Sequence, residues 1–197
     1  MTATAELGLR ERKKAATRQA LHDAALRLAI EHGNERVTVE AIADEVGVSR
    51  RTFSNYFANK EEALLYGDTQ RMRALIDLVH ARPAGESAWT ALTNAAADYY
   101  AHFGDLDPEW VAQGRLVRSQ PALVAAQVQT FAAFERELEG EVAARLTEPS
   151  LVRARLTAAT FLVAMRVSLH VWLERAPTAQ LWDLVEESLA EAGRGLQ

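Results

Sequence analysis

Residues 38–60 constrain the fold more than any other part of the chain, because they spell two short helices around one turn. Thr38 can accept a hydrogen bond from a first-turn N–H and so cap the first of these helices. Ile42 and Val46 are four residues apart, which gives that helix a single apolar stripe. Gly47 then supplies the backbone freedom that a sharp exit from the helix needs.

The second helix begins after Ser49, another good capping residue. Its Phe53 and Phe57 are again four apart and face the first helix. At about 100° per residue, Arg51 and Asn55 then point almost directly away from the core. Two helices with this turn and this polarity form a helix-turn-helix, the motif that places its second helix in the major groove of DNA.

The polar face of the second helix favours DNA as its partner. Arginines at 50 and 51 oppose the helix dipole, and a polyanion removes that conflict. Arginine can hold a guanine edge and asparagine an adenine edge, so Arg51, Asn55 and Arg50 are expected at bases. Side chains at the helix ends suit phosphates. The expected DNA-binding residues are Thr38, Ser49, Arg50, Arg51, Thr52, Ser54, Asn55, Tyr56 and Lys60. The alternative is an ordinary amphipathic helix with a solvated polar face.

A longer pattern surrounds this motif between Arg12 and Tyr66. It consists of Thr17-Arg18-Gln19-Ala20-Leu21, Gly33, Val37 to Ala43, Val46 to Ser49, Phe53, Tyr56-Phe57 and Asn59 to Leu64. This stretch, under a third of the chain, resembles the N-terminal domain of TetR-type (TetR/AcrR) transcriptional regulators. The resemblance implies an all-helical dimer with a separate effector domain. The remainder is similar in length to those TetR-type C-terminal domains that accept acyl-CoA-like ligands.

The charge distribution agrees with a DNA-binding N-terminal part. The net charge of the whole chain is −5, yet residues 1–60 carry ten Lys/Arg against eight Asp/Glu. The acidic excess therefore lies in residues 61–197, where it discourages nonspecific binding by the wrong face. The basic cluster at 10–14 could reach phosphates, and a solvated charged tail is the alternative reading.

The periodicity along the chain is helical throughout, which predicts an all-α fold of about nine helices. We expect a three-helix helix-turn-helix DNA-binding domain over 1–66, with a flexible arm at 1–11. A larger helical domain for ligand binding and dimerisation follows over 67–197. The expected helices span about 12–32, 39–46, 50–57, 60–80, 86–103, a segment from Pro108, a segment from Pro121, 151–174 and 178–192.

The helix expected over 151–174 is apolar nearly all round between Ala158 and Leu173. A surface helix has a polar face, so we expect this one to be covered on both sides, the second side by another subunit. The helix over 178–192 offers a partner stripe of Leu181, Trp182, Val185 and Leu189. Such a homodimer would read an approximately palindromic operator in double-stranded DNA. The alternative is the central core helix of a monomer.

Ten of the fourteen aromatic residues follow residue 83, which favours an apolar, helix-lined site for a small-molecule effector in the C-terminal part. Aromatic residues at helical spacing also build ordinary cores, so each has that second reading. An arginine on an apolar helix needs an anion, either from the protein or from a ligand. The expected ligand-binding residues are Tyr99, Phe103, Trp110, Arg115, Phe131, Phe134, Arg166 and His170.

Other classes of function find less support. The chain has no cysteine, no nucleophile elbow, no phosphate-binding glycine loop and no zinc-binding His pair, so we expect no enzyme, no metal and no cofactor. The five histidines are scattered, and His22 and His32 are expected at the surface. The start lacks a signal peptide and the longest apolar run is interrupted by polar residues, so a cytoplasmic protein without a membrane span is expected. The prediction is a transcriptional repressor released by an effector, with activation also open. The alternative is a helical adaptor protein that does not bind DNA.

Overall fold

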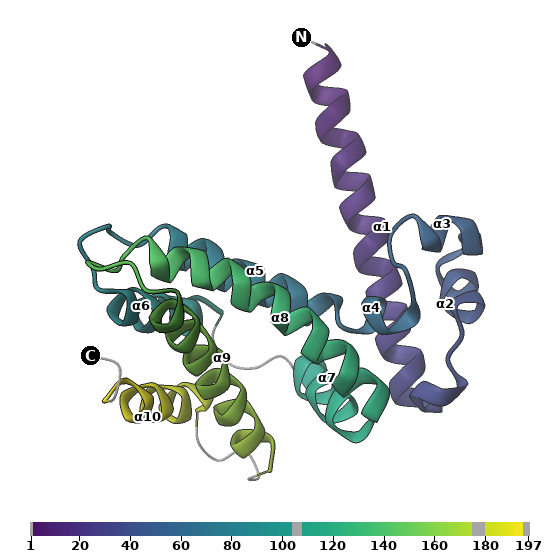
Figure 1. Ribbon diagram of the computed structural model, residues 1–197. Coiled ribbons are helices and arrows are strands. Elements are labelled where there is room, and N and C mark those ends of the chain that lie inside the picture. Colours follow the sequence, from purple (N-terminus) through teal and green to yellow (C-terminus); the bar gives the residue numbers. More distant parts are fainter. Residues whose placement is uncertain (1, 104–107, 175–179, 195–197) are drawn as a thin grey trace. The chain divides into compact units, whose positions relative to one another are not determined.

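The computed structural model describes the backbone of residues 2–103, 108–174 and 180–194 (Figure 1). Every regular element in these ranges is helical, which confirms the all-α fold. The chain divides into two compact units. Unit 1 contains the residues up to Asp68 together with Ala112–Gln127, and unit 2 contains Thr69–Val111 and the residues from Val128 onward.

Unit 1 is built from the N-terminal helices. They are α1 (Thr2–His32), the 3-10 turn η1 (Asn34–Arg36), α2 (Val39–Val46), α3 (Arg50–Ser54) and α4 (Lys60–Leu64). The expected inward residues Ile42, Phe53 and Phe57 are at most 2% exposed and pack in one core with Leu21 of α1. Leu123 belongs to the same core, so the segment 112–127 completes the unit.

The first helix is longer than the sequence analysis proposed. Residues 1–11 were expected as a flexible arm, yet α1 is already helical from Thr2. Alanine, leucine, glutamate and arginine occupy seven of the ten positions from 2 to 11, and these strong helix formers outweigh Thr2, Thr4 and Gly8. The prediction for His32 is confirmed, because its side chain is exposed. The prediction for His22 is wrong: its ring is 6% exposed and its Nδ1 lies 2.8 Å from the carbonyl oxygen of Ala63.

The single helix expected over 60–80 is interrupted at Leu65, between α4 and α5 (Tyr66–His80). In an unbroken helix the carbonyls of Ala63 and Leu64 would accept from N–H groups four residues later. Here the carbonyl of Ala63 bonds the ring of His22, and that of Leu64 accepts the side-chain amide of Gln113 at 2.7 Å. Side chains that enter the hydrogen-bond ladder are a known cause of helix breaks.

Unit 2 contains the other long helices. They are most of α5, α6 (Ala88–Phe103), the start of α7 (Pro108–Ser119), most of α8 (Pro121–Ala143), α9 (Leu151–Glu174) and α10 (Leu181–Gly193). The expected starts at Pro108 and Pro121 are confirmed, as are the bounds 151–174. Its core includes Trp89 and Phe161, whose rings meet edge to face at 6.5 Å. Trp89 also packs closely on Gly193: a Cβ at this glycine would lie 2.3 Å from the indole Nε1.

Helix α9 has two apolar faces. One face, with Ala158 and Phe161, is buried in unit 2, and the opposite face exposes Val152, Leu156 and Val163 by 69%, 56% and 47%. Because of its length and composition, α9 is the one helix in the described ranges that could cross a membrane.

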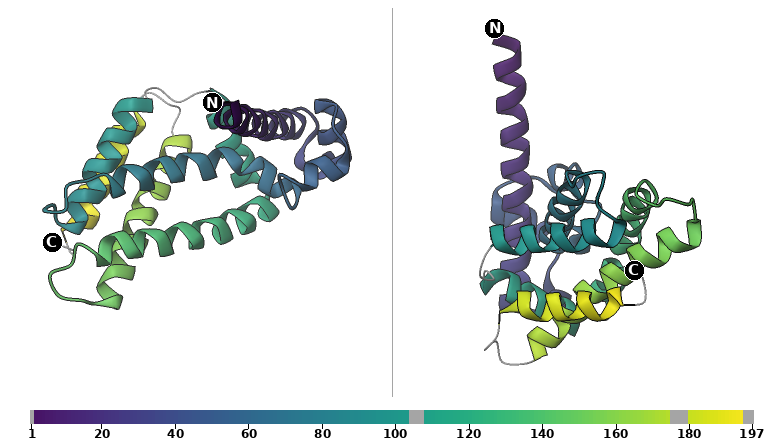
Figure 2. Two further views of the ribbon diagram at one scale, coloured as in Figure 1. Left: turned by 90° about the horizontal axis from the view of Figure 1, so that it is seen from above. Right: turned by 90° about the vertical axis from the view of Figure 1, so that its left-hand side faces the viewer.

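Helix α10 packs along α9 and α6, as the two views of Figure 2 also show. Its stripe Leu181, Trp182, Val185 and Leu189 was expected to face a partner subunit. Leu181, Val185 and Leu189 are instead at most 4% exposed within the chain itself, and Trp182 is half-buried with its ring centre 5.7 Å from that of Tyr100. The reason is that α6 and α9 present enough apolar surface to cover this stripe in the same subunit.

A charged network joins α5 to α8 inside unit 2. Nδ1 of His80 lies 2.8 Å from Oε1 of Glu141, and Oε2 of the same carboxylate accepts from Nη1 of Arg145 at 2.9 Å. Arg145 in turn donates to the carbonyl of Val79 at 2.9 Å. Burial raises the pKa of Glu141, but the hydrogen bonds from His80 and Arg145 outweigh it and leave this pKa below its ordinary value.

Candidate nucleic-acid interface

The helix-turn-helix is fixed by local hydrogen bonds. Oγ1 of Thr38 accepts from the N–H of Ala41 at 3.1 Å, and Oγ of Ser49 accepts from the N–H of Thr52 at 3.0 Å. Gly47 adopts the left-handed conformation at φ 71°, which a residue with a Cβ takes only under strain. The predicted caps and the predicted glycine turn are therefore confirmed. They leave the hydroxyls of Thr38 and Ser49 at the exposed starts of α2 and α3.

The outer face of α3 carries the residues expected at bases. Arg51, Ser54 and Asn55 are exposed, while Phe53 is fully buried beneath them. Among the described residues Arg51 has neither an ion pair nor a hydrogen bond through its guanidinium. Arg50 differs, because its Nη1 lies 2.9 Å from Oε1 of Glu40 on α2. The two adjacent arginines thus stand in different electrostatic surroundings.

Helix α3 is shorter than predicted. It was expected over 50–57 and ends at Ser54, with Asn55 as its C-cap. Tyr56 follows in a turn, and the carbonyl of Tyr56 accepts from Nη2 of Arg18 at 2.8 Å. The Arg18 guanidinium also lies 5.1 Å from the ring centre of Phe57. A side chain of α1 therefore holds the end of α3, a role that the periodicity of the sequence does not reveal.

Lys60 was expected to contact a phosphate, but its side chain is half-buried against the chain. Its ammonium donates to the carbonyls of Asn34 at 2.6 Å and Val37 at 3.0 Å, which fastens the start of α4 to η1. An ammonium has three donors, and two of them are used here. Asn59 caps the same helix by accepting from the N–H of Glu62 at 2.8 Å.

The residues expected to bind an effector lie on several helices. Tyr99 is buried on α6, next to Tyr100. Burial of the Tyr100 hydroxyl raises its pKa far above the usual value. Trp110 is half-buried on α7 and stacks under the guanidinium of Arg71 at 4.9 Å. Phe103 ends α6, and its side chain lies outside the described residues.

The other expected effector residues are on α7, α8 and α9. On α8, Phe134 is 6% exposed and Phe131 is half-buried. Arg115 is exposed and belongs to unit 1. Arg166 was expected to be buried beside an anion but is exposed in the single chain, because it lies on the outer half of α9. His170 is half-buried on the same helix.

Two protein-family models match this chain, one in its N-terminal part and one in its C-terminal part. Residues 21–66 match the family model described as bacterial regulatory proteins, tetR family, and residues 86–197 match the MftR C-terminal domain. A curated relative is the HTH-type transcriptional regulator TcmR of Streptomyces glaucescens. It is 35% identical over 179 residues, which cover 87% of this chain and 79% of the relative.

Solved structures of low identity share the fold. FadR of Thermus thermophilus, a TetR-family transcriptional repressor in complex with lauroyl-CoA, is 23% identical with a TM-score of 0.57, over 91% of this chain and 95% of that one. SmeT in complex with triclosan is 19% identical with a TM-score of 0.62, over 91% of each chain. SmeT is the repressor of a multidrug efflux pump of Stenotrophomonas maltophilia.

Proposed function

The chain belongs to the TetR family of bacterial regulatory proteins, and we propose that it acts as a cytoplasmic homodimer that reads an approximately palindromic operator. As a member of this family it is a DNA-binding transcriptional regulator and not an enzyme. It represses transcription and is released from DNA by a small-molecule effector. The finer proposals concern which residues read DNA, which face dimerises and what the effector is.

The observation that carries the proposal is the outer face of α3. Arg51 and Asn55 are exposed there on a scaffold whose caps and core are complete, so these two side chains are assigned to base edges. Thr38, Ser49, Thr52, Ser54 and Tyr56 surround them and are assigned to the phosphates that set register. Arg50 was expected at a base edge together with Arg51 and Asn55. We assign it instead to a phosphate, because its guanidinium is paired with Glu40 of α2. Lys60 keeps one donor for a phosphate while it fastens α4.

The dimer is proposed to form through the outer face of α9. Val152, Leu156, Val163 and Val167 lie within about 60° of one another around this helix and directly opposite its buried face. A membrane is the other apolar environment that could cover them. It would place exposed Arg166 within the hydrocarbon, at a cost of about 2.5–3.5 kcal/mol. A second subunit covers the stripe and leaves that guanidinium at the rim. Helix α10 would contribute its outer side only, since its apolar stripe is already used.

The effector is proposed to be an apolar small molecule, with acyl-CoA as the first class to test. The support is the set of aromatic side chains of unit 2, together with the lauroyl-CoA and triclosan bound by two proteins of the same fold. The effector must bind the DNA-free state more tightly, because a ligand shifts an equilibrium only by its differential affinity. The segment 112–127 is the connection we propose for transmission, because Gln113 on α7 bonds the end of α4.

The test begins with selection from random duplexes by the purified protein, followed by a footprint of the enriched sequence. We expect two protected half-sites with centres about 34–36 Å apart or a multiple of it. Binding should weaken steeply with salt. Lauroyl-CoA should then weaken binding of the selected duplex, with free CoA as its control and triclosan as a second apolar probe. Selection without any enriched sequence would favour the adaptor reading and contradict the proposed function.

A further inference from the structure

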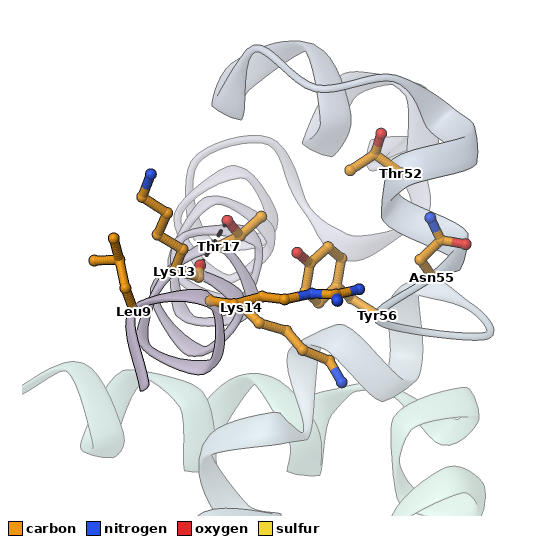
Figure 3. A pocket seen from close by; sticks show the side chains of 8 residues that line it. Leu9, Lys13, Lys14, Thr17, Thr52, Asn55 and Tyr56 are labelled. Atoms are coloured by element: carbon orange, nitrogen blue, oxygen red, sulfur yellow. Dashed lines mark hydrogen bonds between the residues drawn. The ribbon is translucent and has the colours of Figure 1, made fainter. Parts of the chain in front are cut away.

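A groove of about 530 Å³ runs between the N-terminal turns of α1 and the outer end of α3, both within unit 1 (Figure 3). Thr52, Asn55 and Tyr56 form the wall on the α3 side. Lys13 and Lys14 are among the side chains on the α1 wall. The groove therefore joins the expected DNA-reading surface to the basic cluster at 10–14, for which the sequence left both a phosphate contact and a solvated tail open.

The α1 wall is a cationic helix face. Its lining residues stand at positions 9, 10, 13, 14 and 17, a spacing that places all of them on one side of a helix. Glu11, the acid of the same basic cluster, falls on the opposite side and does not line the groove. Within the described ranges the ammonium groups of Lys13 and Lys14 have no ion pair. Their charge is therefore uncompensated in the free protein.

The expected position of α3 on DNA determines what occupies the groove between α1 and α3. When a recognition helix lies in the major groove of DNA, the sugar–phosphate strand that borders the major groove must run past the helix. Thr52 and Tyr56 supply neutral hydrogen-bonding groups on that side, next to Asn55, which remains assigned to a base edge. The α1 wall adds the positive charge that a phosphodiester requires. It also presents Leu9, a 48% exposed apolar side chain that suits a deoxyribose.

We propose that this groove binds one phosphodiester strand of the operator, with Lys13 and Lys14 of α1 as its phosphate contacts. This inference rests on the proposed function and adds a second DNA-binding element to it. Because these contacts reach the backbone alone, they raise affinity for every sequence and carry no base preference.

The experiment compares Lys13→Gln/Lys14→Gln with a charge-matched control, Arg73→Gln/Arg136→Gln, whose residues are exposed on α5 and α8 of unit 2. Binding of the selected duplex and of a scrambled duplex is measured by anisotropy from 0.05 to 0.4 M salt. Each lost phosphate contact lowers the salt slope by about 0.9 and weakens binding about 5-fold at 0.15 M. The lysine variant should lose about two such contacts per protomer on both duplexes. The control should keep the wild-type slope.

The outcomes distinguish failure of the phosphate site from failure of the proposed regulator function. If the lysine variant keeps the wild-type salt slope and still prefers the selected duplex, the proposed phosphate site is wrong and the proposed regulator function stands. Equal losses in the lysine variant and the control overturn it as well, since the effect is then one of net charge. A wild-type protein with no preferred duplex contradicts the proposed function itself. Urea unfolding of each variant verifies that the fold is kept.

Discussion

Replacing Arg51 by alanine should abolish one base preference in each half-site while leaving the fold intact. The side chain is exposed, and in the described part of the chain its guanidinium has no partner whose loss would cost stability. Surface changes of this kind alter the free energy of unfolding by about 0.5 kcal/mol or less. A bidentate contact to guanine, in contrast, supplies about 1–3 kcal/mol of discrimination.

The magnitude follows from the two-fold geometry. A dimer loses the contact twice, so about 4 kcal/mol of specific binding disappears when each contact contributes about 2 kcal/mol. At 1.4 kcal/mol per tenfold, affinity for the selected duplex should fall roughly 10³-fold. Affinity for a scrambled duplex should fall only by the loss of two charges.

Arg50→Ala is the matched control, because it removes the same charge one residue earlier. Arg50 is held at 2.9 Å by Glu40, so its loss should weaken the selected and scrambled duplexes by similar factors. Selection repeated with each variant gives the base preferences directly. Preferences that persist unchanged in Arg51→Ala would refute the assignment of this residue. The same preferences lost equally in both variants would show that charge, and not base contact, explains them.

Four other predictions follow from single residues. Lys60→Met should destabilise unit 1 by about 2–3 kcal/mol in urea unfolding, because two carbonyls lose a charged donor; unchanged stability would return Lys60 to a purely phosphate role. Gly193→Ala should destabilise unit 2 by about 1–3 kcal/mol, since its new methyl group overlaps Trp89, and unchanged Trp fluorescence and stability would contradict that packing. Val163→Glu should give single chains in sedimentation and lose operator binding, whereas an intact dimer would remove α9 from the interface. The pKa of Glu141 is lowered in the folded chain, so its contribution is present above the ordinary carboxyl pKa and is lost as the pH falls through the lowered value; Glu141→Gln should flatten this acid sensitivity in pH-dependent unfolding.

Local chemistry made the motif predictable from sequence. The caps at Thr38 and Ser49 and the left-handed Gly47 depend on residues within four positions, so their identities are enough to place them. The core positions Phe53 and Phe57 follow from helical spacing for the same reason. These features locate α2 and the start of α3 within the chain.

The rest of the site depends on partners that are distant in sequence. Lys60 bonds carbonyls 23 and 26 residues away, and Arg18 bonds a carbonyl 38 residues away. Neither pairing leaves a periodic signal. The break at Leu65 has the same origin, because His22 and Gln113 take the carbonyls that would have continued the helix. The identities of His22 and Gln113 do not indicate which carbonyls they bind.

The two adjacent arginines illustrate how the structure divides tasks that the sequence leaves equal. An exposed ion pair such as Arg50 with Glu40 contributes about 0–1 kcal/mol, enough to orient the side chain and too little to oppose a phosphate. Arg50 can therefore move from one carboxylate oxygen to DNA at small cost and set the register of α3. Arg51 has no such anchor and remains available to a base edge. Specificity and affinity thus separate at neighbouring positions, because a single acid on α2 faces one arginine and not the other.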